Sequence, residues 1–121
     1  MNTYTFHICP SLCEGFGHYI SEGLSCGAVV ITNNCAPMNE LVNCNNGILI
    51  KNCIIHETEM KILECKITES SIENVIEQSI LLDGIEMNKL KENAESSFQT
   101  NLKNFDCNIN IVLTFICNNT I

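Results

Sequence analysis

The chain has 121 residues, of which 45% are hydrophobic, and this size and composition favour one packed domain and argue against global disorder. The formal net charge is −8, which opposes binding to nucleic acid or to anionic lipid, because both need basic patches. An acidic protein can still bind an anionic ligand through local devices such as a helix N-terminus.

Neither a membrane span nor a secretion signal is expected. No apolar run approaches the roughly 18 to 20 residues that cross a bilayer. The first residues, MNTYTFHICPS, contain no basic region, and their apolar run is too short for a signal peptide. We therefore expect a cytoplasmic protein.

The nine cysteines are expected to be reduced and to act as small hydrophobic residues. Their number is odd, no CxxC pair occurs, and no secretion signal is expected, so a disulfide framework is not favoured. A zinc site is the alternative, but Cys9 and Cys13 form the only close pair and no second pair matches it.

The N-terminal part of the chain predicts alternating strands and helices. Residues 5–9 are β-prone, end before Pro10 and lack a clean alternation, as in a strand buried on both faces. Residues 11–17 are typical of a turn. A helix is predicted over residues 18–25, with Gly27 as its C-terminal stop, and residues 28–32 (AVVIT) form the strongest predicted strand.

The middle of the chain continues this alternation less clearly. After a loop over residues 33–36, Pro37 suits the first position of a short helix that runs to residue 42. A turn with Asn-Asn-Gly leads into a strand over residues 47–51. Residues 52–61 fit no pattern, and residues 62–67 fit either a short strand or an extended connector.

Two helices are predicted in the C-terminal part. Ser70 and Glu73 fit a capping box at the start of the first helix. This helix has a regular apolar face, and it is expected to end before Asp83 and Gly84. A second helix has an apolar stripe that we assign to core packing: Met87, Leu90, Ala94, Phe98 and Leu102. Residues 106–117 fit a helix or a strand by composition.

This order of elements predicts an α/β fold with a parallel sheet, in which ligands bind beyond the carboxyl ends of the strands. The turn over residues 11–17 lies at such an end. Its glycines allow close approach to a ligand, the following helix offers free N–H groups to a phosphate, and Glu14 and Glu22 can accept hydrogen bonds from hydroxyls. An ordinary strand–helix turn with two solvated glutamates is the alternative, and spacing alone favours it.

Residues 10–22 resemble the signature of the GT-B glycosyltransferases of family four. In this chain the signature is Pro10-Ser11, then Glu14-Gly15-Phe16-Gly17, then a second glutamate, Glu22. Seven residues separate Glu14 from Glu22. The resemblance continues through GLSCGAVVITNN, the segment Asn-Glu-Leu-Val at residues 39–42, and the turn and strand that begin at residue 46. It covers roughly residues 6–105, and the first forty or so positions are the most specific.

The resemblance implies retaining transfer of a hexosyl group from a nucleotide-sugar donor, without a bound metal or other cofactor. Glu14 would then be the catalytic-centre residue that contacts the donor-sugar hydroxyls, and Glu22 would bind the ribose hydroxyls. The segment from Gly15 to His18, including Phe16 and Gly17, would face the sugar and the diphosphate. His18, at the start of the helix beside the expected phosphate site, is a candidate ligand, whereas His7 is expected to be a core residue.

The resemblance also implies that residues 1–121 form one partial Rossmann-like domain, the C-terminal half of a GT-B donor-binding domain with C-terminal helices. The acceptor domain is missing, and so are the basic residues that the family places before the diphosphate site. The strand near residues 5–9 would be an exposed sheet edge, open to a partner chain or to self-association. The chain would then be a segment of an enzyme and inactive alone. One alternative is a non-catalytic module that binds a nucleotide sugar or docks on a partner, and another is a decayed fragment.

Overall fold

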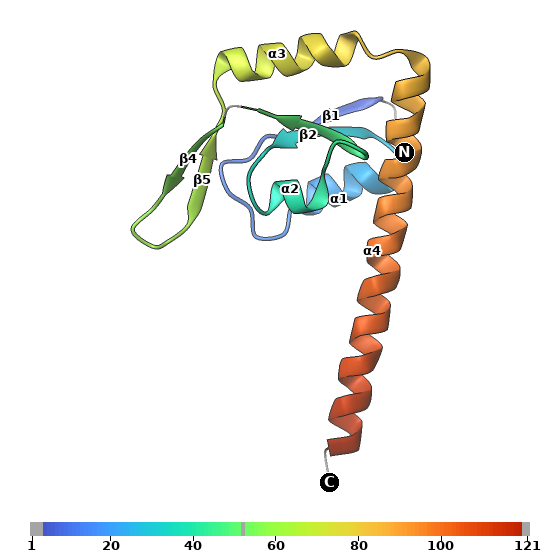
Figure 1. Ribbon diagram of the computed structural model, residues 1–121. Helices are drawn as coiled ribbons and strands as arrows, with labels where there is room; N and C mark the ends of the chain where they lie inside the picture. Colours follow the sequence, from blue (N-terminus) through green and yellow to red (C-terminus); the bar gives the residue numbers. More distant parts are fainter. Residues whose placement is uncertain (1–3, 52, 120–121) are drawn as a thin grey trace.

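The computed structural model describes residues 4–51 and 53–119 and shows a mixed α/β chain (Figure 1). Two of its elements were not expected in this form: a hairpin that stands apart from the sheet, and one long C-terminal helix. In chain order the elements are β1 (Phe6–Ile8), α1 (His18–Ser25), β2 (Val29–Asn33), α2 (Met38–Leu41), β3 (Gly47–Ile50), β4 (Ile54–Glu57), β5 (Leu63–Lys66), α3 (Glu69–Ile80) and α4 (Gly84–Asn119).

The sheet has three parallel strands in the order β1-β2-β3, which confirms the predicted parallel arrangement. The central strand, β2, is buried along its whole length. Its apolar β-branched residues form the strand because both of its faces are covered. β1 is an edge strand of this sheet, as the resemblance implied. The expectation of a strand buried on both faces is wrong, because β1 has a neighbouring strand on one side only: Phe6 and His7 are half-buried and Ile8 is exposed.

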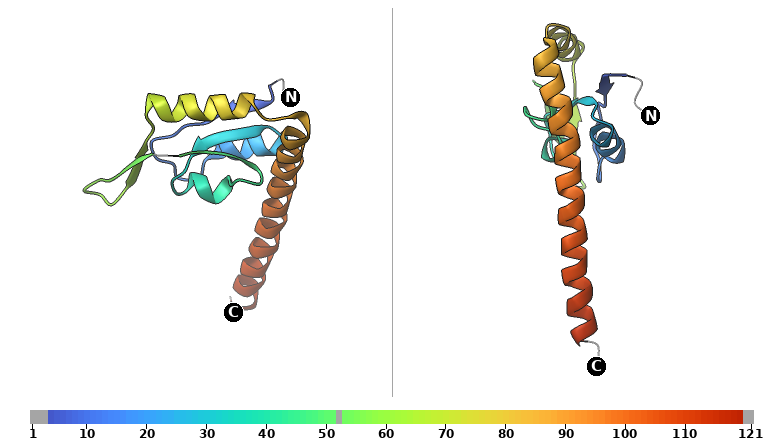
Figure 2. Two further views of the ribbon diagram at one scale, coloured as in Figure 1. Left: turned by 45° about the horizontal axis from the view of Figure 1, so that its top comes forward. Right: turned by 90° about the vertical axis from the view of Figure 1, so that its right-hand side faces the viewer.

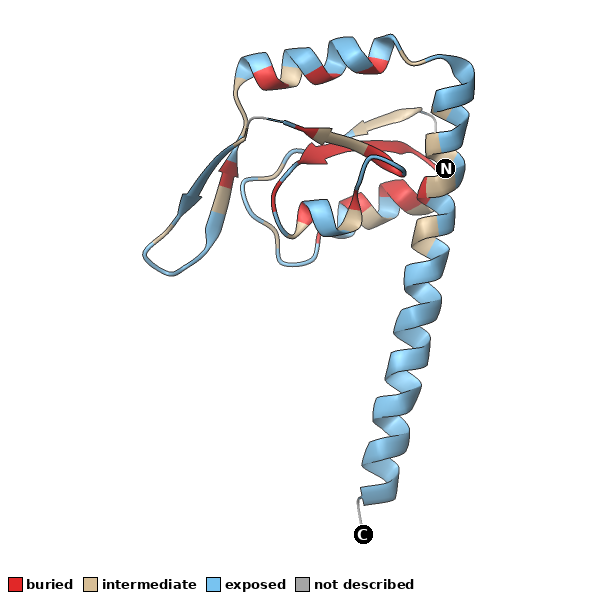
Figure 3. Cartoon of the chain, in the orientation of Figure 1, coloured by how far each residue is buried: buried red, intermediate tan, exposed pale blue. Residues whose placement is uncertain are grey.

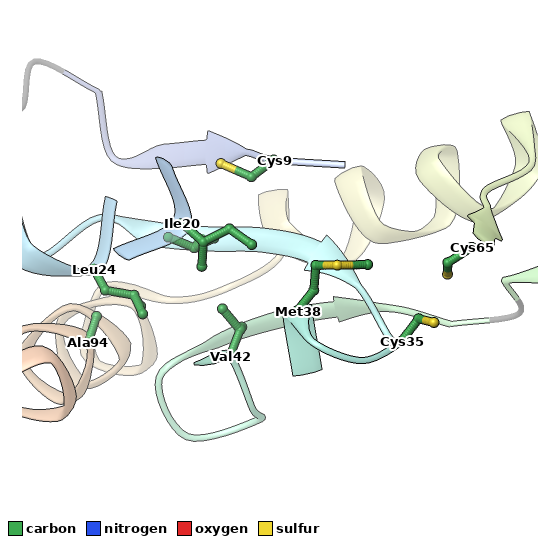
Figure 4. Close-up of a cluster of buried hydrophobic side chains, with 9 residues drawn as sticks. Cys9, Ile20, Leu24, Cys35, Met38, Val42, Cys65 and Ala94 are labelled. Atoms are coloured by element: carbon green, nitrogen blue, oxygen red, sulfur yellow. The ribbon is translucent and has the colours of Figure 1, made fainter. Parts of the chain in front are cut away.

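Helices cover both faces of the sheet (Figure 1). Successive residues of β2 point to opposite faces, so Val30 packs with residues of α1 and α2, while Ile31 packs with Val75 of α3. Figure 4 shows the larger cluster, in which Ile20 and Leu24 of α1 lie near Ala94 of α4. This layer holds α1 in place beside the loop that precedes it.

The helix predicted over residues 18–25 is confirmed. Gly27 follows the C-cap residue with a φ of 64°, the left-handed conformation that glycine adopts most readily at this position. Gly23 allows the close packing of α1 on the sheet, since a Cβ there would come within 2.9 Å of Val30 Cγ2. Gly27 therefore allows the helix to end, and Gly23 allows it to pack closely on the sheet.

The strand alternative for residues 62–67 is confirmed, but this strand does not join the main sheet. β5 pairs in antiparallel fashion with β4, which lies in the stretch where the sequence showed no pattern. Ile54 and Ile55 of β4 are exposed, whereas Cys65 of β5 is buried. The hairpin therefore contacts the core through one side of β5, and β4 carries no buried face that periodicity could reveal.

The capping box predicted at Ser70 and Glu73 is wrong by two residues. Thr68 is the N-cap of α3, and its side chain accepts a hydrogen bond from the N–H of Ser71. Asp83, which was predicted only to end the preceding helix, also caps α4. Its Oδ1 accepts hydrogen bonds of 2.8 Å from the N–H groups of Ile85 and Glu86.

The apolar stripe of α4 is only partly a core feature. Ala94 is fully buried and Phe98 packs against the core, but Leu102 is 45% exposed. Polar contacts fasten the same part of the helix, since Asn46 donates to the hydroxyl of Ser97. The helical alternative for residues 106–117 is confirmed, and this part of α4 projects past the rest of the chain (Figure 2). None of the described helices is both long and apolar enough to cross a membrane.

Gly47 offers a test of how closely the strands and the preceding turn are packed. A Cβ at this position would lie 2.6 Å from the carbonyl oxygen of Val30 and 2.6 Å from Val42 Cγ1. We expect Gly47→Ala to lower the free energy of unfolding by about 1 to 3 kcal/mol, the usual cost of overpacking. Urea titration followed by circular dichroism measures this change.

Gly84→Ala is the matched control, because a Cβ at Gly84 meets no atom within 4 Å. Alanine also favours a helix over glycine, so this variant should be at least as stable as the parent chain. Equal destabilisation of the two variants would contradict the packing described for Gly47.

Candidate functional site

The loop between β1 and α1 lies at the carboxyl edge of the sheet and holds every residue predicted for donor binding except His18 and Glu22. Backbone and side-chain hydrogen bonds fasten its first half to β2. The N–H of Cys9 donates to the carbonyl of Ile31, and the hydroxyl of Thr32 donates to the carbonyl of Cys9, both at 2.8 Å. The loop thus starts from a firmly held position.

Asn33, at the end of β2, joins this loop to the separate hairpin. Its Nδ2 donates to the carbonyl of Ser11 at 2.6 Å and to the carbonyl of Cys65 at 2.8 Å. These two acceptors fix the orientation of the amide and leave its buried Oδ1 without a partner in the described part of the chain. The sequence predicted a loop at this residue. Its position at the end of an apolar run was the only sign that its side chain could be buried and hydrogen-bonded.

The glycine turn presents an open helix N-terminus. Gly17 is the N-cap of α1 with a φ of 74°, and the helix has no side-chain cap. Gly15 is exposed, and a Cβ there would meet no atom within 4 Å, so backbone freedom and not crowding explains glycine at this position. The amides at the start of α1 are therefore free of a competing side-chain acceptor, as an anion site requires.

Two aromatic rings flank this N-terminus. The rings of Phe16 and His18 lie with their centroids 4.9 Å apart and tilted by 46°. Phe16 is 59% exposed, and His18 is also exposed. The structure thus brings Gly15, Phe16 and His18 together as one exposed surface around Gly17, which is itself buried.

Glu14 is half-buried beside the first turn of α1, where its partner is Tyr19. Burial raises the pKa of Tyr19 above its ordinary value of 10.0, and the hydrogen bond and negative charge of Glu14 raise it further, against an opposing contribution from Ser11. Tyr19 is 36% exposed and is therefore not a core residue of α1, and no sequence pattern indicated its link to Glu14.

Glu22 is exposed on α1, three positions after Tyr19 and four after His18. These spacings place the three side chains on one side of the helix. Glu14 lies in the loop before α1 and raises the pKa of Tyr19, which is on this side of the helix.

An apolar cavity of about 500 Å³ lies next to this surface, between α4 and the helices α1 and α2. Phe16 and Glu40 belong to its lining, whereas Glu14 and Glu22 do not. Its walls are Phe16, Ser21, Leu24, Glu40, Leu41, Phe98, Asn101, Leu102 and Phe105.

The cysteines behind the loop are free thiols. Cys9, Cys35 and Cys65 are buried in the core, as expected for small hydrophobic residues, but others such as Cys13 are exposed. Burial, and next the hydrogen-bonded neighbour Cys53, raise the pKa of the Cys65 thiol to about 12. Among the described residues, no three His, Cys, Asp or Glu side chains gather in a way that could hold a metal ion.

Comparison of the chain with protein-family models and with curated proteins found no match.

The pKa of Tyr19 tests the contact with Glu14. The sequence has two tyrosines, so Tyr4→Phe leaves Tyr19 as the sole phenol to titrate by ultraviolet absorbance. In that background we expect Tyr19 to ionise above pH 10.0, and Glu14→Gln to lower its pKa part of the way back, because burial remains the larger cause. Glu22→Gln is the control and should leave the titration unchanged; equal shifts from both variants would show that Glu14 makes no specific contact.

The role of Asn33 is tested by Asn33→Ala, which leaves two carbonyl groups at the sheet edge without a donor. We expect the free energy of unfolding to fall by about 2 to 3 kcal/mol, since each unsatisfied buried group is costly. Its exposed neighbour supplies the comparison: Asn34→Ala should change stability by no more than about 0.5 kcal/mol. A similar small effect at both positions would mean that Asn33 does not clamp the edge.

Proposed function

We propose that this chain binds a nucleotide-sugar donor, as the donor-binding segment of a GT-B glycosyltransferase that resembles family four. The observation that supports the proposal is the uncapped N-terminus of α1, which follows a glycine turn at the carboxyl edge of a parallel sheet. The location matches the ligand position of open α/β sheets.

The diphosphate of the donor is the group that this N-terminus suits. Free amides near Phe16, Gly17 and His18 and the positive end of the helix dipole can bind phosphate oxygens. These interactions are local, so the net charge of −8 does not prevent them. The exposed ring of Phe16 offers a flat surface beside the same amides.

The two glutamates suit the hydroxyl groups of the donor. Glu22 is exposed on α1 and free to accept hydrogen bonds from the ribose hydroxyls. Glu14 is assigned to the sugar hydroxyls, and Tyr19 is the neighbour whose pKa it raises. A sugar would either share Glu14 with Tyr19 or replace the phenol.

We assign binding, and not turnover, to these residues. A leaving diphosphate develops negative charge that cationic groups usually stabilise. The sequence has no arginine, and its first lysine is Lys51, which follows β3 on the far side of β2 from the glycine turn. This arrangement also favours the second candidate, a module that binds a nucleotide sugar without transferring it.

Titration with UDP-glucose and with GDP-mannose tests donor binding. We expect amide NMR signals of residues 15–18 to shift, and Glu22→Gln to weaken binding by about 10-fold, the value of a charge-assisted hydrogen bond. Glu73→Gln, on the exposed surface of α3, is the matched control and should bind like the parent chain. Absence of any shift with either donor in the folded protein would overturn the proposal.

A radiolabelled-donor assay then separates the two candidates. Binding without release of labelled sugar supports the non-catalytic module or a segment that needs another part to act. Release that Glu14→Gln abolishes would show that the chain turns over by itself.

A further inference from the structure

The projecting half of α4 has an apolar seam that the described chain leaves uncovered. Every residue from 99 to 119 is exposed, as the uniform colour of this part of the helix shows (Figure 3). Six apolar side chains follow one another at alternating intervals of four and three positions: Phe98, Leu102, Phe105, Ile109, Val112 and Ile116. This spacing is the a/d pattern by which α-helices pair in coiled coils.

We propose that this seam pairs in antiparallel fashion with the same seam of a second copy of the chain. The pair would be symmetric, with Ile109 facing its own counterpart at the centre and Leu102 of each copy near Ile116 of the other. The proposal does not require donor binding or the sheet edge at β1, although Phe16 of the donor surface lines the cavity at one end of the seam.

The first argument is that this helix needs a cover to be stable. Its exposed half is rich in Asn, Ile, Val, Thr and Phe, residues with mediocre or poor helix propensity. A lone helical segment of this length is marginal in water even with good helix formers. Burial of the seam against another helix supplies the stabilisation that its composition lacks.

The second argument is electrostatic and sets the orientation. Lys103 and Asp106 are the only charged residues from position 98 onward, so that segment is neutral and the whole net charge of −8 lies in the rest of the chain. Two seams can therefore meet without repulsion. An antiparallel pair keeps the two acidic bodies at opposite ends, whereas a parallel pair would place them side by side.

The third argument is that the two ends of the seam are complementary. Near the C-terminus, Leu113 and Phe115 flank the seam and widen its apolar surface. At the other end the seam borders the apolar cavity, which Phe98, Leu102 and Phe105 line together with Phe16 and Leu41. Antiparallel pairing lays the widened end of one copy over the cavity side of the other.

The area is adequate for a specific dimer. The side chains from Leu102 onward in the seam are 41–61% exposed, and Leu113 and Phe115 are 52% and 68% exposed. Covering them would bury on the order of 700 Å² per copy, close to the about 800 Å² per partner of a standard interface. A contact of this size is compatible with dissociation at low protein concentration.

Sedimentation equilibrium of the full chain, with circular dichroism at 222 nm at each concentration, tests the pairing. We expect a monomer–dimer equilibrium in which helicity rises with dimerisation. Ile109→Glu should raise the dissociation constant by at least about 100-fold, because it buries an unpaired charge in the seam of each copy. Ile111→Glu is the matched control, since Ile111 is exposed outside the seam, and it should leave the dimer intact.

Three further variants separate the alternatives. Ile8→Lys places a charge on the β1 edge, so loss of the dimer in this variant and not in Ile109→Glu would show that the sheet edge is the contact. Leu102→Lys should weaken the dimer, and adding Ile116→Glu to the same chain should restore it, because an antiparallel pair then places Lys opposite Glu. Failure of this rescue would overturn the orientation, and a monomer at all concentrations would overturn the pairing itself.

Discussion

The amide of Asn33 is the contact on which the carboxyl edge of the sheet depends. It ends the fully buried strand β2 and donates to two carbonyls that belong to segments far apart in the sequence. One acceptor lies in the loop before α1 and the other in the hairpin strand β5. A three-stranded sheet offers little apolar surface for such segments to pack on. The buried hydrogen bonds of Asn33 therefore hold the loop and the hairpin in place.

The clamp also positions the loop on which the proposed phosphate contacts depend. It fixes the beginning of the loop, and the glycine turn then delivers the chain to an uncapped helix N-terminus. The positive potential there comes from aligned peptide groups and not from side chains, so it is confined to the first turn of α1. Under the proposed function this N-terminus would hold a phosphate group, but it would provide little of the charge stabilisation that bond cleavage demands.

The long helix α4 serves two different purposes along its length. Its first half packs Ala94 into the core and joins the turn before β3 through the Asn46–Ser97 hydrogen bond. Its second half presents an apolar seam that continues the line of Phe98 without a break. The same helix therefore stabilises the sheet and extends an apolar surface beyond it.

The sequence by itself determined the strands of the sheet, the limits of α1 and the glycine turn, because local periodicity, glycines and apolar runs act within a few residues. It did not reveal β4, whose residues are all exposed, or the clamp at Asn33, whose acceptors lie 22 and 32 positions away. It also left residues 106–117 open between helix and strand, since their apolar residues satisfy both patterns. Only the structure decided these points. β4 and the clamp depend on strand pairing and hydrogen bonds between distant parts of the chain, which leave no local pattern, and residues 106–117 continue a helix whose earlier turns pack on the core.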